Sequence, residues 1–156
     1  MFEKKYLLRS VEMARRSIAS HGGGPFGAVI VKNGEIVGEG VNTVTTDPDC
    51  TAHAEINALR DACRRLNTFD LSGCELYASC EPCPMCLSAI YWSRIEVVYH
   101  ASTQDDAAEI GFDDRHIYEQ LTLPKDRRFV KLHRHAIPEA EALFQTWKND
   151  REKTPY

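Results

Sequence analysis

The sequence contains no apolar run long enough to cross a membrane, and its first nine residues carry charge too early for a secretory signal peptide. We therefore expect a cytoplasmic protein with no membrane partner. An excess of basic residues is also lacking: Lys and Arg number 19 against 23 Asp and Glu, so the formal net charge is −4. A polyanionic nucleic-acid backbone calls for a basic face, so no nucleic-acid partner is expected.

Linkers, low-complexity segments and internal repeats are missing as well. A chain of 156 residues is the right size for one compact domain, and we expect a single domain over residues 1–156. Six cysteines are present. Because two of them stand at a metal-type spacing and no secretory signal precedes them, we expect thiols rather than disulfides.

Hydrophobic periodicity predicts the secondary structure. The predicted helices cover residues 3–20, 53–66, a stretch from 82 or 83 onward, and 138–149. The predicted strands cover residues 26–32, 35–42, 74–79, 94–100 and 129–135, with short helices and loops over 103–121. This order predicts an α/β fold of three α/β/α layers with a mixed sheet of about five strands.

The sequence pattern also predicts a central strand, a hairpin and the buried faces of two helices. Residues 28–31 are apolar on both faces, which is typical of a central strand, and Asn33-Gly34 favours a hairpin. The first helix is expected to bury Leu7, Val11, Ala14 and Ile18. The last helix is expected to bury Leu143, Phe144 and Trp147.

The most informative motif is His53-Ala54-Glu55 followed by Pro82-Cys83-Pro84-Met85-Cys86. One imidazole and two thiolates, from His53, Cys83 and Cys86, can hold a zinc ion and leave its fourth position to water. Glu55 is placed to exchange protons with that water. His-x-Glu followed by Pro-Cys-x-x-Cys is the signature of zinc-dependent nucleobase deaminases as a class.

Both halves of the motif stand at predicted helix starts, where the partial positive charge favours thiolates at Cys83 and Cys86. Two thiolates cancel the formal charge of zinc and make a bound water less acidic than in an all-histidine site. A nearby base is then required, and we expect Glu55 to be that base.

A structural zinc site is the alternative interpretation, and such sites close with four protein ligands. The remaining cysteines could offer a fourth ligand: Cys50, Cys63, Cys74 and Cys80. Of these, Cys80 is the nearest in sequence to the motif. A zinc-stabilised binding module without catalysis is a related alternative. The intact set of His53, Glu55, Cys83 and Cys86 argues against it, because decay usually erases the acid–base residue first.

Nearly the whole chain resembles the cytidine/deoxycytidylate deaminase superfamily, and most closely the bacterial guanine deaminases. Beyond the zinc motif, the resemblance rests on residues 24–29, 51–55, 79–86, 89–92, 111–114 and 117–118, and on Asn42. It implies a cytidine deaminase-like fold, one Zn²⁺ per subunit and the hydrolysis of guanine to xanthine and ammonia. It also implies a homodimer in which the C-terminal tail, residues 148–156, covers an active site, with the C-terminal segment exchanged between subunits.

The same resemblance implies roles for single residues. Glu55 and Asp114 would be catalytic, with Asp114 ranked above its neighbour Asp113. The expected substrate-binding residues contact the edge or the ring faces of the base: Phe26, Asn42, Ala54 through its backbone amide, Trp92, Asp113 and Tyr156.

Most of these residues also have a structural interpretation. Phe26 and Trp92 could be plain core, and Asn42 could cap a turn. Asp113 and Asp114 could cap a helix. The tail with Tyr156 could be frayed.

Two other substrate classes stay open. A basic cluster over residues 125–135 would suit a groove for RNA, and tRNA adenosine deaminases share the zinc motif. Deamination of a related base or nucleoside, such as guanosine, cytosine or an amino-triazine, is also compatible with the sequence.

Overall fold

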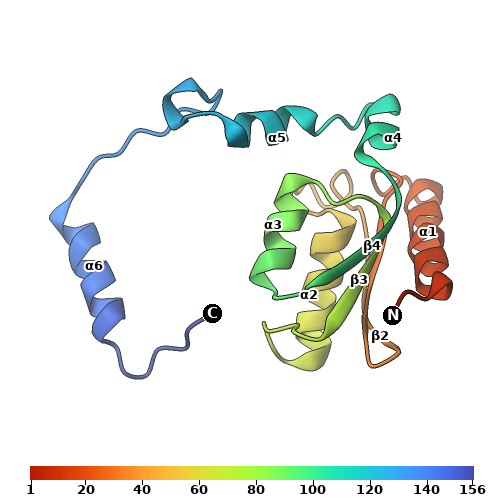
Figure 1. Cartoon of the computed structure of the whole chain (residues 1–156), viewed down its shortest axis with the longest axis horizontal. Helices are drawn as coiled ribbons and strands as arrows, with labels where there is room; N and C mark the ends of the chain where they lie inside the picture. The colour runs from red at the N-terminus through yellow and green to blue at the C-terminus, as the bar shows by residue number, and fades with distance from the viewer. The chain divides into compact units, whose positions relative to one another are not determined.

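A four-stranded mixed sheet organises the first 116 residues (Figure 1). The computed structural model describes all 156 residues, which form two units, Met1–His116 and Ile117–Tyr156. The strands are β1 (Gly27–Lys32), β2 (Glu35–Val41), β3 (Cys74–Cys80) and β4 (Val97–Ser102), in the spatial order β2-β1-β3-β4. β1 is antiparallel to β2 and β3, and β3 is parallel to β4.

Helices cover both faces of this sheet (Figure 1). They are α1 (Lys4–Ala19) on one face, and α2 (Ala54–Leu66) and α3 (Pro84–Trp92) on the other. After β4 come the short helix α4 (Gln104–Glu109) and α5 (Arg115–Thr122). The expected three-layer α/β/α architecture with a mixed sheet is therefore confirmed, with four strands where about five were expected.

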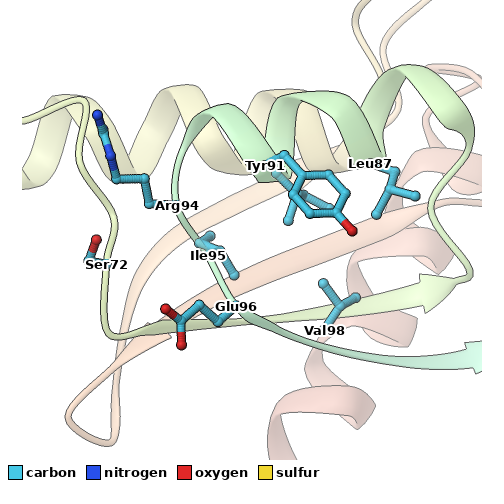
Figure 2. A pocket seen from close by; sticks show the side chains of 8 residues that line it. Ser72, Leu87, Tyr91, Arg94, Ile95, Glu96 and Val98 are labelled. Atoms are coloured by element: carbon cyan, nitrogen blue, oxygen red, sulfur yellow. The ribbon is translucent and has the colours of Figure 1, made fainter. Parts of the chain in front are cut away.

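One of the two edge strands of the sheet is β4, whose residues are exposed or half-buried. Beside it lies a cavity of about 510 Å³ between α3 and the start of β4 (Figure 2). The residues that line it include Tyr91, Arg94, Ile95, Glu96 and Val98. An edge strand of this kind presents backbone N–H and C=O groups to which another strand can bind.

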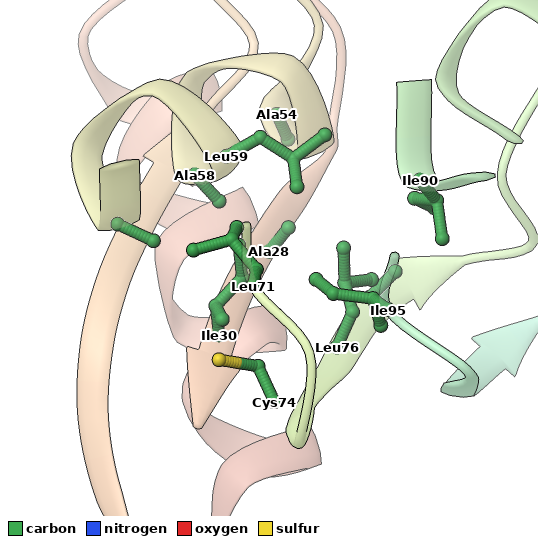
Figure 3. Close-up of a cluster of buried hydrophobic side chains, with 12 residues drawn as sticks. Ala28, Ile30, Ala54, Ala58, Leu59, Leu71, Cys74, Leu76, Ile90 and Ile95 are labelled. Atoms are coloured by element: carbon green, nitrogen blue, oxygen red, sulfur yellow. The ribbon is translucent and has the colours of Figure 1, made fainter. Parts of the chain in front are cut away.

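The core has two parts because β1 is buried on both faces, as its apolar run predicted. Ala28 and Ile30 face α2 and α3 and join the larger cluster, which Figure 3 shows. Val29 and Val31 point the other way, toward Tyr6 on α1 and Tyr77 on β3. The hairpin between β1 and β2 turns at Asn33 and Gly34, both at positive φ, as expected.

The position of α2 depends on a close approach to β2. A Cβ built on Gly40 of β2 would overlap the backbone of α2 at Ala54 and Ala58. Ala54 and Ala58 are both fully buried. Only glycine on the strand and alanine on the helix permit this spacing, and it fixes the height of the N-terminus of α2 above the sheet.

The buried face of α1 differs from the expected one. Ala14 is buried as expected, but Leu7 and Val11 are half-buried and Ile18 is 54% exposed. The helix instead buries Tyr6, Ser10, Ala14 and Ser17. The serine hydroxyls donate to Leu7 O (2.8 Å) and Asn42 O (2.9 Å), which satisfies them in the core.

Residues 117–156 form a different kind of unit. They contain most of α5, the 3₁₀ turn η1 (Lys125–Arg127) and α6 (Pro138–Asn149), and none of their side chains is buried. α6 is a helix as predicted, but Leu143, Phe144 and Trp147 are exposed rather than buried.

The strand predicted over residues 129–135 is not formed. Within its unit this segment has no neighbouring strand, and a strand needs a ladder partner to satisfy its backbone. The strand predicted over 94–100 is β4, shifted to begin at Val97, because Arg94 adopts a positive φ that ends the preceding helix. No helix of the structure has both the length and the apolar character that a bilayer span requires.

Candidate active site

Two helix starts bring the three expected metal ligands together. His53 is the N-cap residue of α2, Cys83 is the N-cap residue of α3, and Cys86 lies in the first turn of α3. His53 Nδ1 lies 3.5 Å from Cys83 Sγ and 3.5 Å from Cys86 Sγ. Standard zinc bond lengths and tetrahedral angles separate a nitrogen and a sulfur ligand by roughly 3.6 Å. The donor set therefore fits one zinc ion.

The group of possible ligands stops at three residues. Cys80, the nearest alternative, instead directs its thiol to Thr103 O at 3.4 Å. All six cysteines are free. Three ligands without a fourth are the pattern of an open, catalytic zinc site rather than a closed structural one.

The thiol charges are set by this geometry. The hydrogen bond from Cys86 and the nearby His53 imidazole lower the pKa of Cys83 to about 4. The hydrogen bond to Cys83 and burial raise the pKa of Cys86, because the pair shares one proton. The contact with Cys83 also raises the pKa of His53. A divalent cation among these atoms would favour thiolates at both sulfurs and a neutral imidazole.

Glu55 lies in the first turn of α2 and is almost fully buried, with 7% of its surface exposed. Its Oε2 accepts from Cys86 Sγ at 3.5 Å, so the carboxylate borders the ligand group. Burial raises the pKa of Glu55 to about 7. A carboxyl group that can both take and give a proton near neutral pH suits general acid–base chemistry.

A cavity of about 450 Å³ opens beside His53. Phe26 and Asn42, both expected at the site, line it, and Phe112 contacts Phe26 edge-to-face with ring centroids 4.9 Å apart. Phe26 is half-buried: it packs against the core and also lines the cavity, and its contact with a substrate stays a prediction. The cavity offers ring faces and a few polar groups, as a planar heteroaromatic ligand requires.

Sequence reasoning missed seven residues of this cavity: His21, Gly23, Gly24, Pro25, Val44, Thr45 and Phe112. His21 and Thr45 stand in loops with no periodicity, and nothing in their neighbours marks them. The segment 111–114 contributes to the family resemblance, but that resemblance assigns no role to Phe112. Its place directly before the expected Asp113 and Asp114 was the available signal.

Asp114 reaches the site from the loop after α4. It is half-buried, and burial and the nearby Cys83 thiolate raise its pKa. Its Oδ1 and Gln104 Nε2 are both buried without a hydrogen-bond partner within 3.5 Å, although the amide is near enough to offset part of the rise in pKa. Asp113, in contrast, is exposed and binds the Arg115 guanidinium at 2.8 and 2.9 Å.

The segment that carries Asp114 is anchored to β3 and the residues after it. Glu81 N donates to Ser102 O at 2.9 Å, and Glu81 Oε2 accepts from Gln104 N at 3.1 Å. Thr103 and Asp106 form a capping box that starts α4. Together with the contact of Cys80 to Thr103, these bonds hold the segment beside the metal ligands.

Three expected substrate-binding residues have different settings. Ala54 is the first residue of α2, so its N–H has no acceptor within the helix and can serve a ligand. Trp92 is 67% exposed at the opposite end of α3 from Cys83 and is not among the residues that line the cavity. Tyr156 belongs to the second unit and is 73% exposed. The roles of all three stay predictions.

Residues 1–102 match the family described as the cytidine and deoxycytidylate deaminase zinc-binding region. The matched residues include the three metal ligands and Glu55. The chain therefore belongs to this family of zinc-dependent deaminases.

Its relatives share more than the metal site. The chain is 47% identical over all 156 residues to the guanine deaminase of Bacillus subtilis, with 100% of both proteins covered. The X-ray structure of that protein matches with a TM-score of 0.95 over 100% of this chain and 99% of the other. The tRNA-specific adenosine deaminase of Aquifex aeolicus is 38% identical over 141 residues, which are 90% of each chain.

Proposed function

We propose that this protein hydrolyses guanine to xanthine and ammonia, using one zinc ion per subunit. The observation that carries the proposal is the end-to-end similarity to a guanine deaminase, at 47% identity with every residue of both chains covered. That similarity includes residues 103–156, which the family match over 1–102 does not reach.

The geometry supports a small planar base. The cavity beside His53 presents the rings of Phe26 and Phe112 and the amide of Asn42. These groups can hold a base by its faces and one edge, next to the metal ligands and Glu55.

The chain's own residues supply positioning and proton transfer. Bound zinc supplies the activation of a water molecule for attack on the amine-bearing carbon. Glu55 takes one proton from the attacking water at a carboxylate oxygen and gives it to the ring nitrogen, and then takes the second water proton and gives it to the departing amine. Asn42 and the Ala54 N–H hold the edge of the base, and Asp114 holds the purine and assists Glu55. One water is consumed and one ammonia released per guanine.

Ammonia release from a panel of purified compounds tests the proposal. Guanine is expected to be turned over with the highest kcat/KM among guanine, guanosine, cytosine, an amino-triazine and a tRNA substrate. The zinc content is measured in the same preparation, so that an inactive sample without metal is recognised. A zinc-loaded protein that ignores guanine and deaminates another member of the panel contradicts the proposal.

Deamination of adenosine in tRNA is the second candidate, favoured by the 38% identity to a tRNA-specific adenosine deaminase over 90% of the chain. The net charge of −4 weighs against it, because a tRNA backbone is bound through Lys and Arg. The tRNA arm of the panel separates the two.

We also propose that two chains form a homodimer in which each second unit joins the first unit of its partner. One domain would then be completed from two chains, with the tail of residues 148–156 over an active site. The support is complementary: β4 has an exposed edge beside an apolar cavity, and residues 117–156 bury none of their apolar side chains.

Sedimentation velocity tests the dimer directly. Wild-type protein is expected to sediment as a dimer, and Phe144→Asp, at an apolar position that is 74% exposed, is expected to weaken that dimer. The control is Glu139→Lys, a charge change in the first turn of the same helix. A wild-type monomer at micromolar concentration would contradict the arrangement.

A cytoplasmic location is proposed on the state of the cysteines. All six are free, including the two at the metal site. Thiolate ligands persist where the surroundings are reducing, as in the interior of a cell.

A further inference from the structure

The side chain of Asn42 is held in one orientation by the backbone around it. Asn42 is buried, and its Oδ1 accepts hydrogen bonds from Gly24 N and Val44 N, both at 3.2 Å. Two donors converging on one atom require that atom to be the oxygen, since an amide nitrogen there would face them without an acceptor. The Nδ2 hydrogens are thereby left for the cavity that Asn42 lines.

The backbone of Asn42 is fixed as well. Asn42 N donates to Phe26 O at 3.1 Å, and the Ser17 hydroxyl donates to Asn42 O at 2.9 Å. Ser17 is 1% exposed, and its hydroxyl oxygen also lies 3.1 Å from Gly24 O, so its single hydrogen is shared between the two carbonyls. One buried hydroxyl thus ties Asn42 and the glycine loop to α1.

Gly23 sits against this amide. Its φ is +152°, a conformation that side chains other than hydrogen rarely adopt. A Cβ built on Gly23 would overlap Asn42 Oδ1 and lie 2.8 Å from Asn42 O. The space that the amide oxygen occupies therefore exists only because residue 23 has no side chain.

We infer that Gly23 is a positioning residue that sets the orientation of Asn42 and so makes this part of the cavity a hydrogen-bond donor. The substrate must then present an acceptor, such as a carbonyl oxygen or an unprotonated ring nitrogen, at this point. The inference rests on the proposed function in one respect: it takes Asn42 as a contact of the base. Gly23 also lines the cavity, but the three atoms nearest to an added Cβ all belong to Asn42, so its effect on the substrate is expected through the displaced amide.

The first experiment compares Gly23→Ala with Gly73→Ala. Gly73 also has a positive φ, +77°, but a Cβ there meets nothing within 4 Å, so its variant reports backbone strain alone. Gly23→Ala is expected to raise KM for guanine, and Ki for xanthine, at least about tenfold at unchanged zinc content. Gly73→Ala is expected to stay within about twofold of wild type. Equal effects of the two variants would overturn the inference.

A double-mutant cycle tests whether Gly23 acts through Asn42. In an Asn42→Ala background the amide oxygen is gone and only the backbone contact of the added Cβ remains, so Gly23→Ala is expected to change the Ki for xanthine by about threefold at most. A full additional loss in that background would show that Gly23 acts by another route and would overturn the inference.

The same cycle remains informative if Gly23→Ala is unstable or if the substrate is not guanine. If Gly23→Ala is too unstable to assay, melting temperatures replace Ki in the same cycle. Asn42→Ala is then expected to restore part of the melting temperature that Gly23→Ala loses, and no restoration overturns the inference. If wild-type protein turns over a base other than guanine, the proposed substrate is wrong, and the cycle is run with the product of that base.

Discussion

Residues 1–116 and 117–156 bury their apolar side chains to very different extents. In the first unit Ile30, Leu76 and Tyr77 are fully buried. In the second, Phe129 and Phe144 are 79% and 74% exposed. The first unit contains the sheet, both core clusters and every metal ligand, whereas the second consists of most of α5, the 3₁₀ turn η1 and α6, joined by irregular chain. The difference shows that an apolar pattern predicts a core only when the covering surface lies within the same unit.

If the first unit carries out the reaction, the largest loss of activity is expected from a change at its buried carboxylate, Glu55. Glu55→Gln keeps the shape of the side chain but removes its ability to carry protons, so kcat should fall by about a thousandfold or more. Zinc content and melting temperature should stay near wild type. Steady-state ammonia release and metal analysis check this, with the exposed Glu109→Gln as control. Near-native turnover by the Glu55 variant would remove the acid–base assignment.

The next largest effect separates two neighbouring aspartates at the boundary between the units. Asp114→Asn should lower kcat/KM by about a hundredfold, because this half-buried carboxylate lies near Cys83. Asp113→Asn should cost less than about threefold, because an exposed pair with Arg115 contributes little. Kinetics with guanine rank the two, and the reverse order would transfer the proposed role to Asp113.

Deletion of residues 153–156 tests whether the second unit takes part in binding the substrate. If Tyr156 covers an active site, KM for guanine should rise roughly tenfold while kcat changes less, because an aromatic contact with the bound base is lost. The control replaces Lys153 with Ala and keeps the tyrosine. Unchanged kinetics in the shortened chain would mean that the tail is only solvated.

The smallest expected effect is on stability, and it tests directly whether the two units differ in burial. Ile30→Ala should destabilise the protein by about 3 kcal/mol at any concentration, since it opens a cavity in the core. Leu143→Ala, at a position 69% exposed, should cost less than about 0.5 kcal/mol in a monomer. A cost that grows with protein concentration would show that a second copy covers Leu143. Denaturant unfolding at two concentrations measures both variants.

Much of the first unit could be predicted from the sequence because its local signals agree with its packing. β1 is apolar on both faces and is buried on both, and the Asn33-Gly34 turn forms the expected hairpin. The metal ligands followed from residue type and spacing, and the structure places them within 4.8 Å of one another.

The predictions that were wrong concern residues whose burial or strand pairing depends on contacts with distant parts of the chain. α1 buries Ser10 and Ser17, which the apolar pattern would place outside, because carbonyls of Leu7 and Asn42 accept their hydroxyls. Periodicity cannot report such a partner. The segment 129–135 alternates as a strand should, but alternation does not supply the neighbouring strand that the backbone needs.

Four consecutive residues, 80 to 83, join two parts of the site that are distant in the sequence. Cys83 holds the metal position, while Cys80 and Glu81 hold the chain that delivers Asp114. A structural change in residues 80–83 would therefore displace both the metal position and the Asp114 carboxylate. The consequence for engineering is that these two halves of the site cannot be tuned independently through residues 80–83.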